Sequence, residues 1–366
     1  MNAIKEDNQF LIDYLLHYKY NCFGDKMEFA ILILSLIIIL VAAELFVNAI
    51  EWLGKLLNLS EGAVGSVLAA IGTALPETLI PIIALLTNDT AHSSEIGIGA
   101  ILGSPLMLST LTMFVTGCAI ILCKKKRTHH DKALVNIKNI SHDLKYFIFS
   151  FTLALVCGFI PESLKTIKIF IAISLFIGYI LYIVELVKGN RDEQDNEIPE
   201  LYFSLKNSNI MKEKYAIILV IFQAAVALFL IIFGADKFVN SLSYISNLMH
   251  IPAFVLAIIL TPIATELPEK FNSVIWISRE KDTLALGNIT GAMMFQASIL
   301  PAIGILLTNW SLTSSGTLIS ALIAIGSASL LLIELKTKKH LTAKMLLTCG
   351  LFYLLFLILV FTGIIK

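Results

Sequence analysis

The segment "TPIATELPEKF" (residues 261–271) places charges and helix-breaking prolines directly after a long apolar run. It holds Glu266, Glu269 and Lys270, whereas the 28 residues that precede Glu266 contain no Asp, Glu, Lys or Arg. Acidic groups within an apolar span are energetically costly, and in membrane proteins they mark ion or proton pathways. The segment therefore predicts a polar site inside a membrane-spanning region.

The composition of the whole chain agrees with a polytopic membrane protein. Of the 366 residues, 57% are hydrophobic and 15% are charged, and the mean hydropathy is +0.84. Uncharged runs reach 21 to 51 residues, and about 20 apolar residues cross a bilayer as a helix. We therefore expect an all-α polytopic membrane protein whose main partner is the lipid bilayer.

Other classes of protein receive no support from the composition. The net charge is zero, so there is no electrostatic reason to expect nucleic-acid binding. The five cysteines show no disulfide or metal-binding spacing and are interpreted as small apolar residues. Residues 1–27 lack the pattern of a removable signal peptide.

Ten transmembrane helices are predicted from the apolar runs. They cover residues 29–50, 62–87, 96–122, 146–160, 168–187, 215–247, 252–278, 283–307, 315–334 and 343–365. The longest polar segments, 123–145 and 188–214, are expected to be surface loops.

The basic residues orient these helices in the membrane. With the N-terminus outside, 19 of the 27 Lys and Arg residues fall in inner segments, six fall in outer segments and two lie within spans. Because Lys and Arg are retained on the cytoplasmic side, we predict that both termini lie outside the cell (plasma or inner) membrane. The cluster "KKKRTHH" (124–130) is then a cytoplasmic stop-transfer block.

The sequence contains an internal repeat. Three short stretches recur in order, namely "AELFVN" (43–48) as "ADKFVN" (235–240), "GTALPE" (72–77) as "ATELPE" (264–269), and "GAILGS" (99–104) as "GNITGA" (287–292). The offset is 192 residues for the first two pairs and 188 for the third. Self-similarity at a nearly fixed offset indicates duplication.

The two copies are expected to be inverted, because each contains an odd number of spans. Five spans precede the connecting loop and five follow it, so the second copy enters the membrane from the opposite side. Inverted repeats with interrupted helices at matching positions are typical of transporters. The predicted division is an extramembrane segment (1–27), a first repeat (28–187), a cytoplasmic loop (188–214) and a second repeat (215–366).

Each half combines a proline with oxygen-bearing groups. The proline removes the hydrogen-bond partner of the carbonyl four residues earlier, a threonine follows that carbonyl, and a glutamate follows the proline. Hard cations such as Ca²⁺ and Na⁺ bind carbonyl, hydroxyl and carboxylate oxygens of this kind. The groups are Gly72, Thr73, Pro76 and Glu77 in the first half and Ala264, Thr265, Pro268 and Glu269 in the second.

The third and eighth spans are the expected partners of these glutamates. Segments 97–104 and 286–292 each contain a GxxxG pattern, which allows a neighbouring helix to approach closely. Ser104, Asn288 and Gln296 are candidates for further ion ligands. Glu266 lies four residues before Lys270, so it is either a ligand or proton carrier, or a structural ion pair with that lysine.

These paired motifs resemble the calcium/cation antiporter superfamily, which includes the sodium/calcium exchangers. "GTALPE" and "ATELPE" are similar to the family's "GTSLPE"-like motif, and "GAILGSPLML" (99–108) and "GNITGAMMFQ" (287–296) are similar to its "GNxxGSNxxN"-like motif. The alpha motifs then span residues 72–108 and 264–296. The resemblance implies that Glu77 and Glu269 bind the transported metal ion, with Thr73, Thr265 and Ser104 nearby.

Several positions depart from the family's motifs. These positions are Ala74, Pro105, Leu108, Glu266, Ala292 and Gln296. They remove side-chain oxygens from the third span and rearrange those of the eighth. The departures indicate a divergent branch with a different ion stoichiometry or with coupling to protons.

The predicted function is secondary active antiport without a cofactor. The resemblance implies exchange of Ca²⁺, or a related cation, against Na⁺ by alternating access, and an H⁺-coupled antiporter of the same fold is the alternative. A channel would not couple two gradients. An intramembrane enzyme is disfavoured, because the chain has no HExxH metal pair and no paired intramembrane aspartates.

Overall fold

The computed structural model describes residues 2–56, 69–86, 92–188, 201–203, 213–311 and 315–365. Its helices are α1 (Asn2–Leu56), α3 (Ala69–Leu86), α4 (Ser93–Met107), α5 (Met113–Cys123), α6 (Ile137–Cys157), α7 (Lys165–Lys188), α8 (Glu213–Met249), α9 (Ala253–Thr265), α10 (Leu267–Ser278), α11 (Asp282–Leu307), α12 (Ser315–Lys338) and α13 (Ala343–Phe361). A π-helical segment, η2 (Leu108–Thr112), joins α4 to α5, and a short 3₁₀ turn, η3 (Glu162–Leu164), precedes α7.

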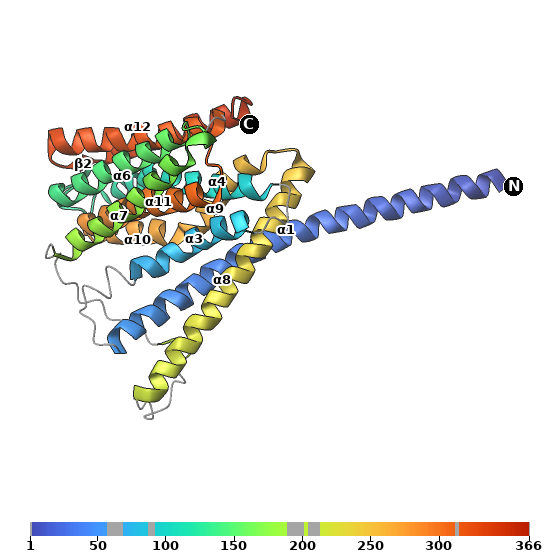
Figure 1. Cartoon of the computed structure of the whole chain (residues 1–366), viewed down its shortest axis with the longest axis horizontal. Coiled ribbons are helices and arrows are strands. Elements are labelled where there is room, and N and C mark those ends of the chain that lie inside the picture. The colour runs from blue at the N-terminus through green and yellow to red at the C-terminus, as the bar shows by residue number, and fades with distance from the viewer. Residues whose placement is uncertain are drawn as a thin grey trace.

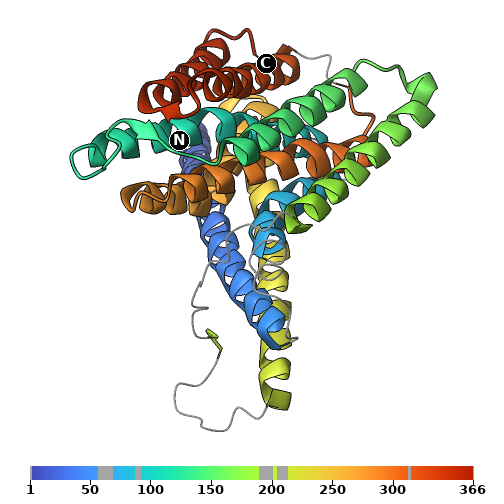
Figure 2. The same cartoon turned by 90° about the vertical axis from the view of Figure 1, so that its left-hand side faces the viewer.

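Most of these helices lie side by side in one bundle, and α1 and α8 form a crossing pair beside it (Figure 1). The view from the side shows the same division, with the lower ends of α1 and α8 extending beyond the bundle (Figure 2). Within the bundle, α4 packs against α9, and α11 packs against α6 and α7. The motif helices of the two sequence halves are therefore interleaved rather than separated.

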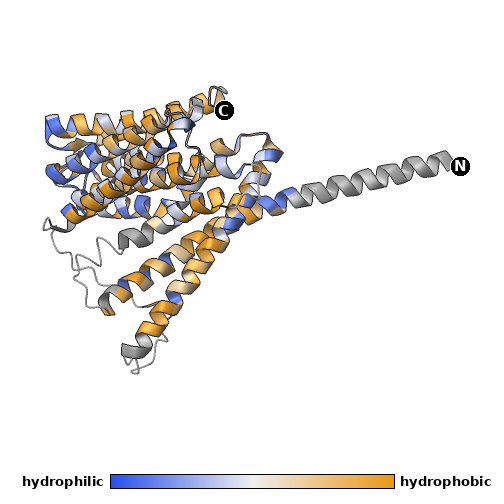
Figure 3. Cartoon of the chain, in the orientation of Figure 1, coloured by the Kyte–Doolittle hydropathy of each residue, from blue (hydrophilic) through white to orange (hydrophobic). Residues whose placement is uncertain are grey.

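Eight helical segments are long and apolar enough to cross a membrane, counting the described residues alone. These are Asp25–Leu53, Ser93–Cys123, Ile137–Cys157, Glu162–Glu185, Ile217–Met249, Asp282–Leu307, Ser315–Lys338 and Ala343–Phe361. Apolar residues dominate the middle of the bundle, and polar ones gather toward its ends (Figure 3). The chain is thus an integral membrane protein built of helices.

The second and seventh predicted spans are not among the eight. Their apolar parts are shorter helices, Pro76–Leu86 and Ala253–Ile263. They are also the two segments that carry the motif glutamates, and the search for spans covers only their described residues.

One predicted boundary is wrong by nine residues. The fourth span was expected at 146–160, but α6 begins at Ile137. The Asn136 side chain accepts a hydrogen bond from the Asn139 amide at 3.2 Å and caps the helix before the apolar run starts. Part of the predicted surface loop 123–145 is therefore helical.

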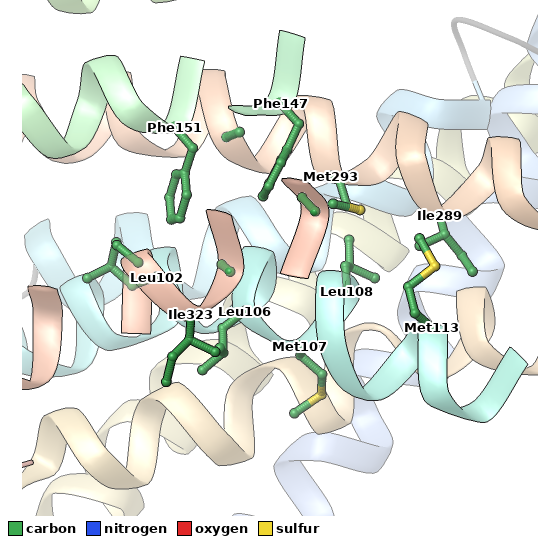
Figure 4. Packing of buried hydrophobic residues seen from close by; sticks show 14 of the residues in the cluster. Leu102, Leu106, Met107, Leu108, Met113, Phe147, Phe151, Ile289, Met293 and Ile323 are labelled. Atoms are coloured by element: carbon green, nitrogen blue, oxygen red, sulfur yellow. The ribbon is translucent and has the colours of Figure 1, made fainter. Parts of the chain in front are cut away.

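The main hydrophobic core lies where α4, α6, α11 and α12 meet. Figure 4 shows Phe147 and Phe151 of α6 above Leu102 and Leu106 of α4, with Met293 of α11 beside them. All five side chains are at most 1% exposed. This core joins elements of both sequence halves into one unit.

Two glycines of the first GxxxG pattern allow α4 and α9 to pack backbone to backbone. A Cβ on Gly99 would lie 2.8 Å from the carbonyl oxygen of Phe254, and one on Gly103 would lie 2.5 Å from that of Ile258. The predicted close approach is therefore confirmed for this helix. The contact holds α9 firmly against α4.

The second GxxxG pattern has no such contact with the described residues. A Cβ on Gly291 would meet none of them within 4 Å, and one on Gly287 would meet Ile140 Cδ1 at 3.9 Å. By the 192-residue offset, the residues that correspond to Phe254 and Ile258 are 62 and 66, which lie outside what the structure describes. Close packing at these two glycines therefore stays a prediction.

A third tight contact joins α1 to α8. A Cβ on Gly234 of α8 would lie 2.8 Å from Ile39 Cγ1 and 3.3 Å from the carbonyl oxygen of Ser35, both on α1. The crossing pair of Figure 1 is therefore packed without room for another side chain at this point.

The polar end of the bundle is held by a buried ion pair and a small sheet. Arg127 Nη2 lies 2.7 Å from Asp282 Oδ2, and both side chains are nearly inaccessible. Strand β1 (Lys132–Ala133) pairs antiparallel with β2 (Leu341–Thr342). Arg127 of "KKKRTHH" is thus buried and bonded, whereas the three lysines before it are exposed, and the stop-transfer interpretation stays a prediction.

Candidate functional site

Glu77 is placed in the bundle by α3. This helix continues without a break through Pro76 and Pro81, so the predicted interruption at Pro76 is wrong. A proline removes one backbone hydrogen bond but does not necessarily end a helix. The side-chain surroundings of Thr73 and the hydrogen bonding of the Gly72 carbonyl lie outside what the structure describes.

The second motif does interrupt its helix. Helix α9 ends at Thr265 and α10 begins at Leu267, and Glu266 between them has φ −98° and ψ 10°. Pro268 occupies the first turn of α10, where its missing N–H breaks no intrahelical bond. Glu266 therefore lies at the junction of the two helices, and Glu269 lies in the first turn of α10. The Ala264 carbonyl was predicted to be an ion ligand, and its surroundings lie outside what the structure describes.

Three glutamates are buried together in this region. Glu77, Glu266 and Glu269 are 3%, 0% and 6% exposed, and Glu266 and Glu269 lie within electrostatic range of the Glu77 carboxylate. Oε1 of Glu77, both carboxylate oxygens of Glu266 and Oε2 of Glu269 have no hydrogen-bond partner in the part of the chain that the structure describes. Buried carboxylate oxygens without donors are costly, so this cluster is suited to a cation.

Residues of α4 and α11 complete the cluster from the opposite sequence halves. Gln296 Nε2 donates a hydrogen bond to Glu77 Oε2 at 2.6 Å, and its own Oε1 is buried without a partner. Ser104 lies next to Glu266, although neither Glu266 oxygen has a hydrogen-bond partner. Each half therefore supplies groups to the glutamates of the other.

Lys270 is the positively charged member of the cluster. Its Nζ lies 3.6 Å from Glu266 Oε2 and donates to Met107 Sδ at 3.0 Å and to the Pro262 carbonyl oxygen at 3.1 Å. The predicted pairing of Glu266 with Lys270 is therefore observed as an ion pair, at a distance longer than a hydrogen bond.

Two predicted ion ligands, Thr265 and Asn288, form no hydrogen bond to the glutamates among the described residues. The Thr265 hydroxyl donates to the Thr261 carbonyl at 3.1 Å, so it is engaged by its own helix. Asn288 is half-buried, and its Nδ2 has no partner, but no contact joins it to the cluster among the described residues.

The cluster is not a closed metal cage. Within the described ranges, no three His, Cys, Asp or Glu side chains converge tightly enough to hold a metal ion by themselves. An ion here would need carbonyl, amide or hydroxyl oxygens in addition to carboxylates, as Ca²⁺ with six to eight oxygen ligands does.

Two features of the site were not predicted. Met107, an apolar residue, contacts Lys270 from the end of α4, and η2 follows it directly. Because Met107 lies within a hydrophobic run, the sequence does not indicate that it contacts Lys270. Pro105, two residues earlier, does indicate a disturbed helix. A π-helical turn inside an α-helix frequently occurs at functional sites.

A buried carboxylate outside the glutamate cluster was also not predicted. Asp143 of α6 accepts hydrogen bonds from the Tyr182 hydroxyl at 3.0 Å and the Thr290 hydroxyl at 2.7 Å. It lies in the segment that was predicted to be a surface loop, where an acidic residue carries no signal of burial.

Comparison with known proteins agrees with this geometry. A family model described as "Sodium/calcium exchanger protein" matches residues 27–188 and 219–362. The chain is 23% identical over 363 residues to the sodium/calcium exchanger MaX1 of Methanosarcina acetivorans, a match that covers 92% of this chain and 99% of that protein.

Solved structures share the fold. The H⁺/Ca²⁺ exchanger CAX has a TM-score of 0.69 at 16% identity, with 91% of this chain and 82% of that chain covered. The sodium-calcium exchanger NCX_Mj has a TM-score of 0.55 at 21% identity, with 90% and 98% covered. These similar proteins are transporters and not enzymes. Because the family model matches most of its length, the chain belongs to the sodium/calcium exchanger protein family.

Proposed function

We propose that the chain is a secondary active cation antiporter that exchanges Ca²⁺, or a related divalent cation, for Na⁺ by alternating access. The observation that carries the proposal is the set of buried carboxylate oxygens on Glu77, Glu266 and Glu269 that have no hydrogen-bond partner among the described residues. These glutamates come from both sequence halves, and a passing cation is the partner that their charge requires.

The proposed ion ligands are the carboxylates of Glu77 and Glu269, one from each half. Gln296 contributes an amide oxygen and orients Glu77 through its 2.6 Å hydrogen bond. Ser104 and Thr265 supply hydroxyl oxygens, and the peptide carbonyls near the prolines complete the shell. This set resembles the mixed oxygen ligands that Ca²⁺ and Na⁺ prefer.

We further propose ten membrane crossings in two inverted repeats. Contacts between chain segments support this topology, because each joins segments that the predicted topology assigns to the same side. On the proposed inner side, Arg127 contacts Asp282 and β1 pairs with β2. On the proposed outer side, Lys168 Nζ donates to the Asn309 carbonyl at 2.7 Å.

Alternating access would be provided by α1 and α8. They form a crossing pair beside the bundle that holds the glutamates (Figure 1), and they correspond to each other in the two repeats. We propose that they slide over the bundle and expose the site to one side of the membrane at a time.

Coupling to H⁺ is the alternative for the counter-ion. Glu266 favours it, because it is a third buried carboxylate in the cluster, and a carboxyl group can carry a proton as well as bind a metal ion. The CAX structure with the same fold is that of an H⁺/Ca²⁺ exchanger. Separate Na⁺ and H⁺ gradients distinguish these two modes of coupling.

Uptake of ⁴⁵Ca²⁺ into proteoliposomes tests the proposal. Vesicles loaded with Na⁺, or with an acidic interior, should accumulate ⁴⁵Ca²⁺ above the external concentration, whereas a channel would only equilibrate it. Glu77→Gln and Glu269→Gln should abolish accumulation. Glu185→Gln, which removes an exposed carboxylate at the end of α7, should leave it intact. Unchanged accumulation in both site variants would refute the assignment of the site.

A further inference from the structure

The buried cluster contains one positive side chain among three negative ones. Lys270 is 11% exposed, and its Nζ is held by Met107 Sδ, by the Pro262 carbonyl and by the charge of Glu266. Among the described residues, the charged groups that act on Glu77 are those of Glu266, Glu269 and Lys270. These four side chains are therefore the ones over which the charge of the site is counted.

The lysine cannot leave this cluster as a transported ion can. Its backbone directly follows that of Glu269, and its ammonium reaches across to α4, where it contacts Met107. It is a positive charge covalently fixed within the site. A strongly hydrated ammonium enters such a region only where an opposite charge and polar acceptors compensate it.

The formal charges determine what the cluster can hold. Three ionised glutamates and one ammonium give a net charge of −2, and an uncompensated buried charge costs several kcal/mol. One divalent cation neutralises this charge, and so do two monovalent cations or protons. A third monovalent ion would leave the cluster positively charged.

We propose that Lys270 is a fixed counter-charge that sets the exchange ratio at two monovalent ions for each divalent ion, so that transport moves no net charge. The inference rests on the proposed antiport but not on the identity of the counter-ion, because Na⁺ and H⁺ carry the same charge. Lys270 takes the place that an additional monovalent ion would occupy beside Glu266.

The test is the dependence of transport on membrane potential. Proteoliposomes containing the full chain are loaded with Na⁺, or with an acidic interior, and the potential is set with K⁺ and valinomycin at zero or at 100 mV inside negative. Steady-state ⁴⁵Ca²⁺ accumulation should be the same at both potentials. A ratio of three to one would export one net charge per cycle and lower accumulation about 50-fold at the negative potential.

Charge variants at the lysine provide the decisive comparison. Lys270→Gln leaves a charge of −3, which one divalent ion does not neutralise, so ⁴⁵Ca²⁺ accumulation should be lost at both potentials. The double variant Glu266→Gln/Lys270→Gln returns the charge to −2, so its ⁴⁵Ca²⁺ accumulation should be restored and should not depend on the membrane potential. Lys270→Arg keeps the positive charge, so whatever ⁴⁵Ca²⁺ accumulation it supports should not depend on the potential.

The outcomes separate this inference from the proposed function. Potential-dependent accumulation by the unmodified protein would overturn the fixed counter-charge, as would accumulation by Lys270→Gln equal to that of the unmodified protein. No accumulation of ⁴⁵Ca²⁺ under either gradient would contradict the proposed antiport itself.

Discussion

Gln296 of α11 donates a hydrogen bond to Oε2 of Glu77 on α3 at 2.6 Å, although 219 positions separate the two residues. The bond links the eighth predicted span to the second, and therefore one sequence half to the other. It also leaves Oε1 of each residue buried without a partner. The pair thus presents two free oxygens that are held in fixed positions.

Replacing Gln296 with Met removes the donor and the amide oxygen while keeping the length of the side chain. Because a partner that orients a ligand commonly contributes 10- to 100-fold to metal affinity, we expect the concentration of Ca²⁺ for half-maximal uptake to rise by about that factor. Ser298→Ala is the matched control, because that hydroxyl bonds only within α11, to Met294 and Phe295. Equal Ca²⁺ dependence of the two variants would argue against a site role for Gln296.

The two GxxxG patterns make opposite predictions for stability. Alanine at Gly103 places a Cβ 2.5 Å from a backbone oxygen of α9, and such overpacking costs about 1–3 kcal/mol. Alanine at Gly291 meets none of the described residues within 4 Å and should be neutral, or stabilising by up to about 1 kcal/mol. Thermal unfolding of the purified protein in detergent checks both, and a Gly103→Ala protein as stable as Gly291→Ala would contradict the packing of α4 against α9.

The Arg127–Asp282 pair is expected to be a stability determinant at the polar end of the bundle. Arg127→Met leaves a buried carboxylate without its cation, which typically costs about 3–5 kcal/mol. The double variant Arg127→Met/Asp282→Asn should recover part of that loss. Lys125→Met, in the same basic cluster but exposed, should change the unfolding temperature little. A small effect of Arg127→Met would show that this pair is solvated.

Surface labelling tests the proposed orientation. In a background without the five native cysteines, single cysteines replace Lys126, Lys339 and Glu162, all of which are exposed. An impermeant maleimide applied to intact cells should label position 162 only, and the other two positions after permeabilisation. Labelling of 126 and 339 from different sides would be incompatible with the ten-crossing topology.

The acidic site was predictable from the sequence because placing a carboxylate inside a membrane span costs much free energy. Glu77, Glu266 and Glu269 interrupt apolar segments, and the cost of placing carboxylates there distinguishes them from the surrounding residues. Pairing of Glu266 with Lys270 follows from their spacing on one helical turn. The orientation of Gln296 toward Glu77 depends on helix packing between the halves, which no local pattern encodes.

Other features depend on three-dimensional surroundings that the sequence does not specify. A GxxxG pattern gives a smooth helix face, and among the described residues a neighbouring helix packs closely on that face at Gly99 and Gly103. Arg127 is one of four consecutive basic residues, and its burial is decided by Asp282, which lies 155 positions away. Asp143 likewise becomes buried because its helix starts before the apolar run begins.

The contact at Gly234 has a mechanical consequence. The backbones are so close here that even a Cβ at position 234 would overlap Ile39 of α1, which opposes sliding of one helix along the other. We therefore expect the proposed movement that exposes the site to one side of the membrane to carry α1 and α8 together as one rigid body. A bulky residue at position 234 would force this body apart and stall the cycle, while the glutamates in the bundle stay in place.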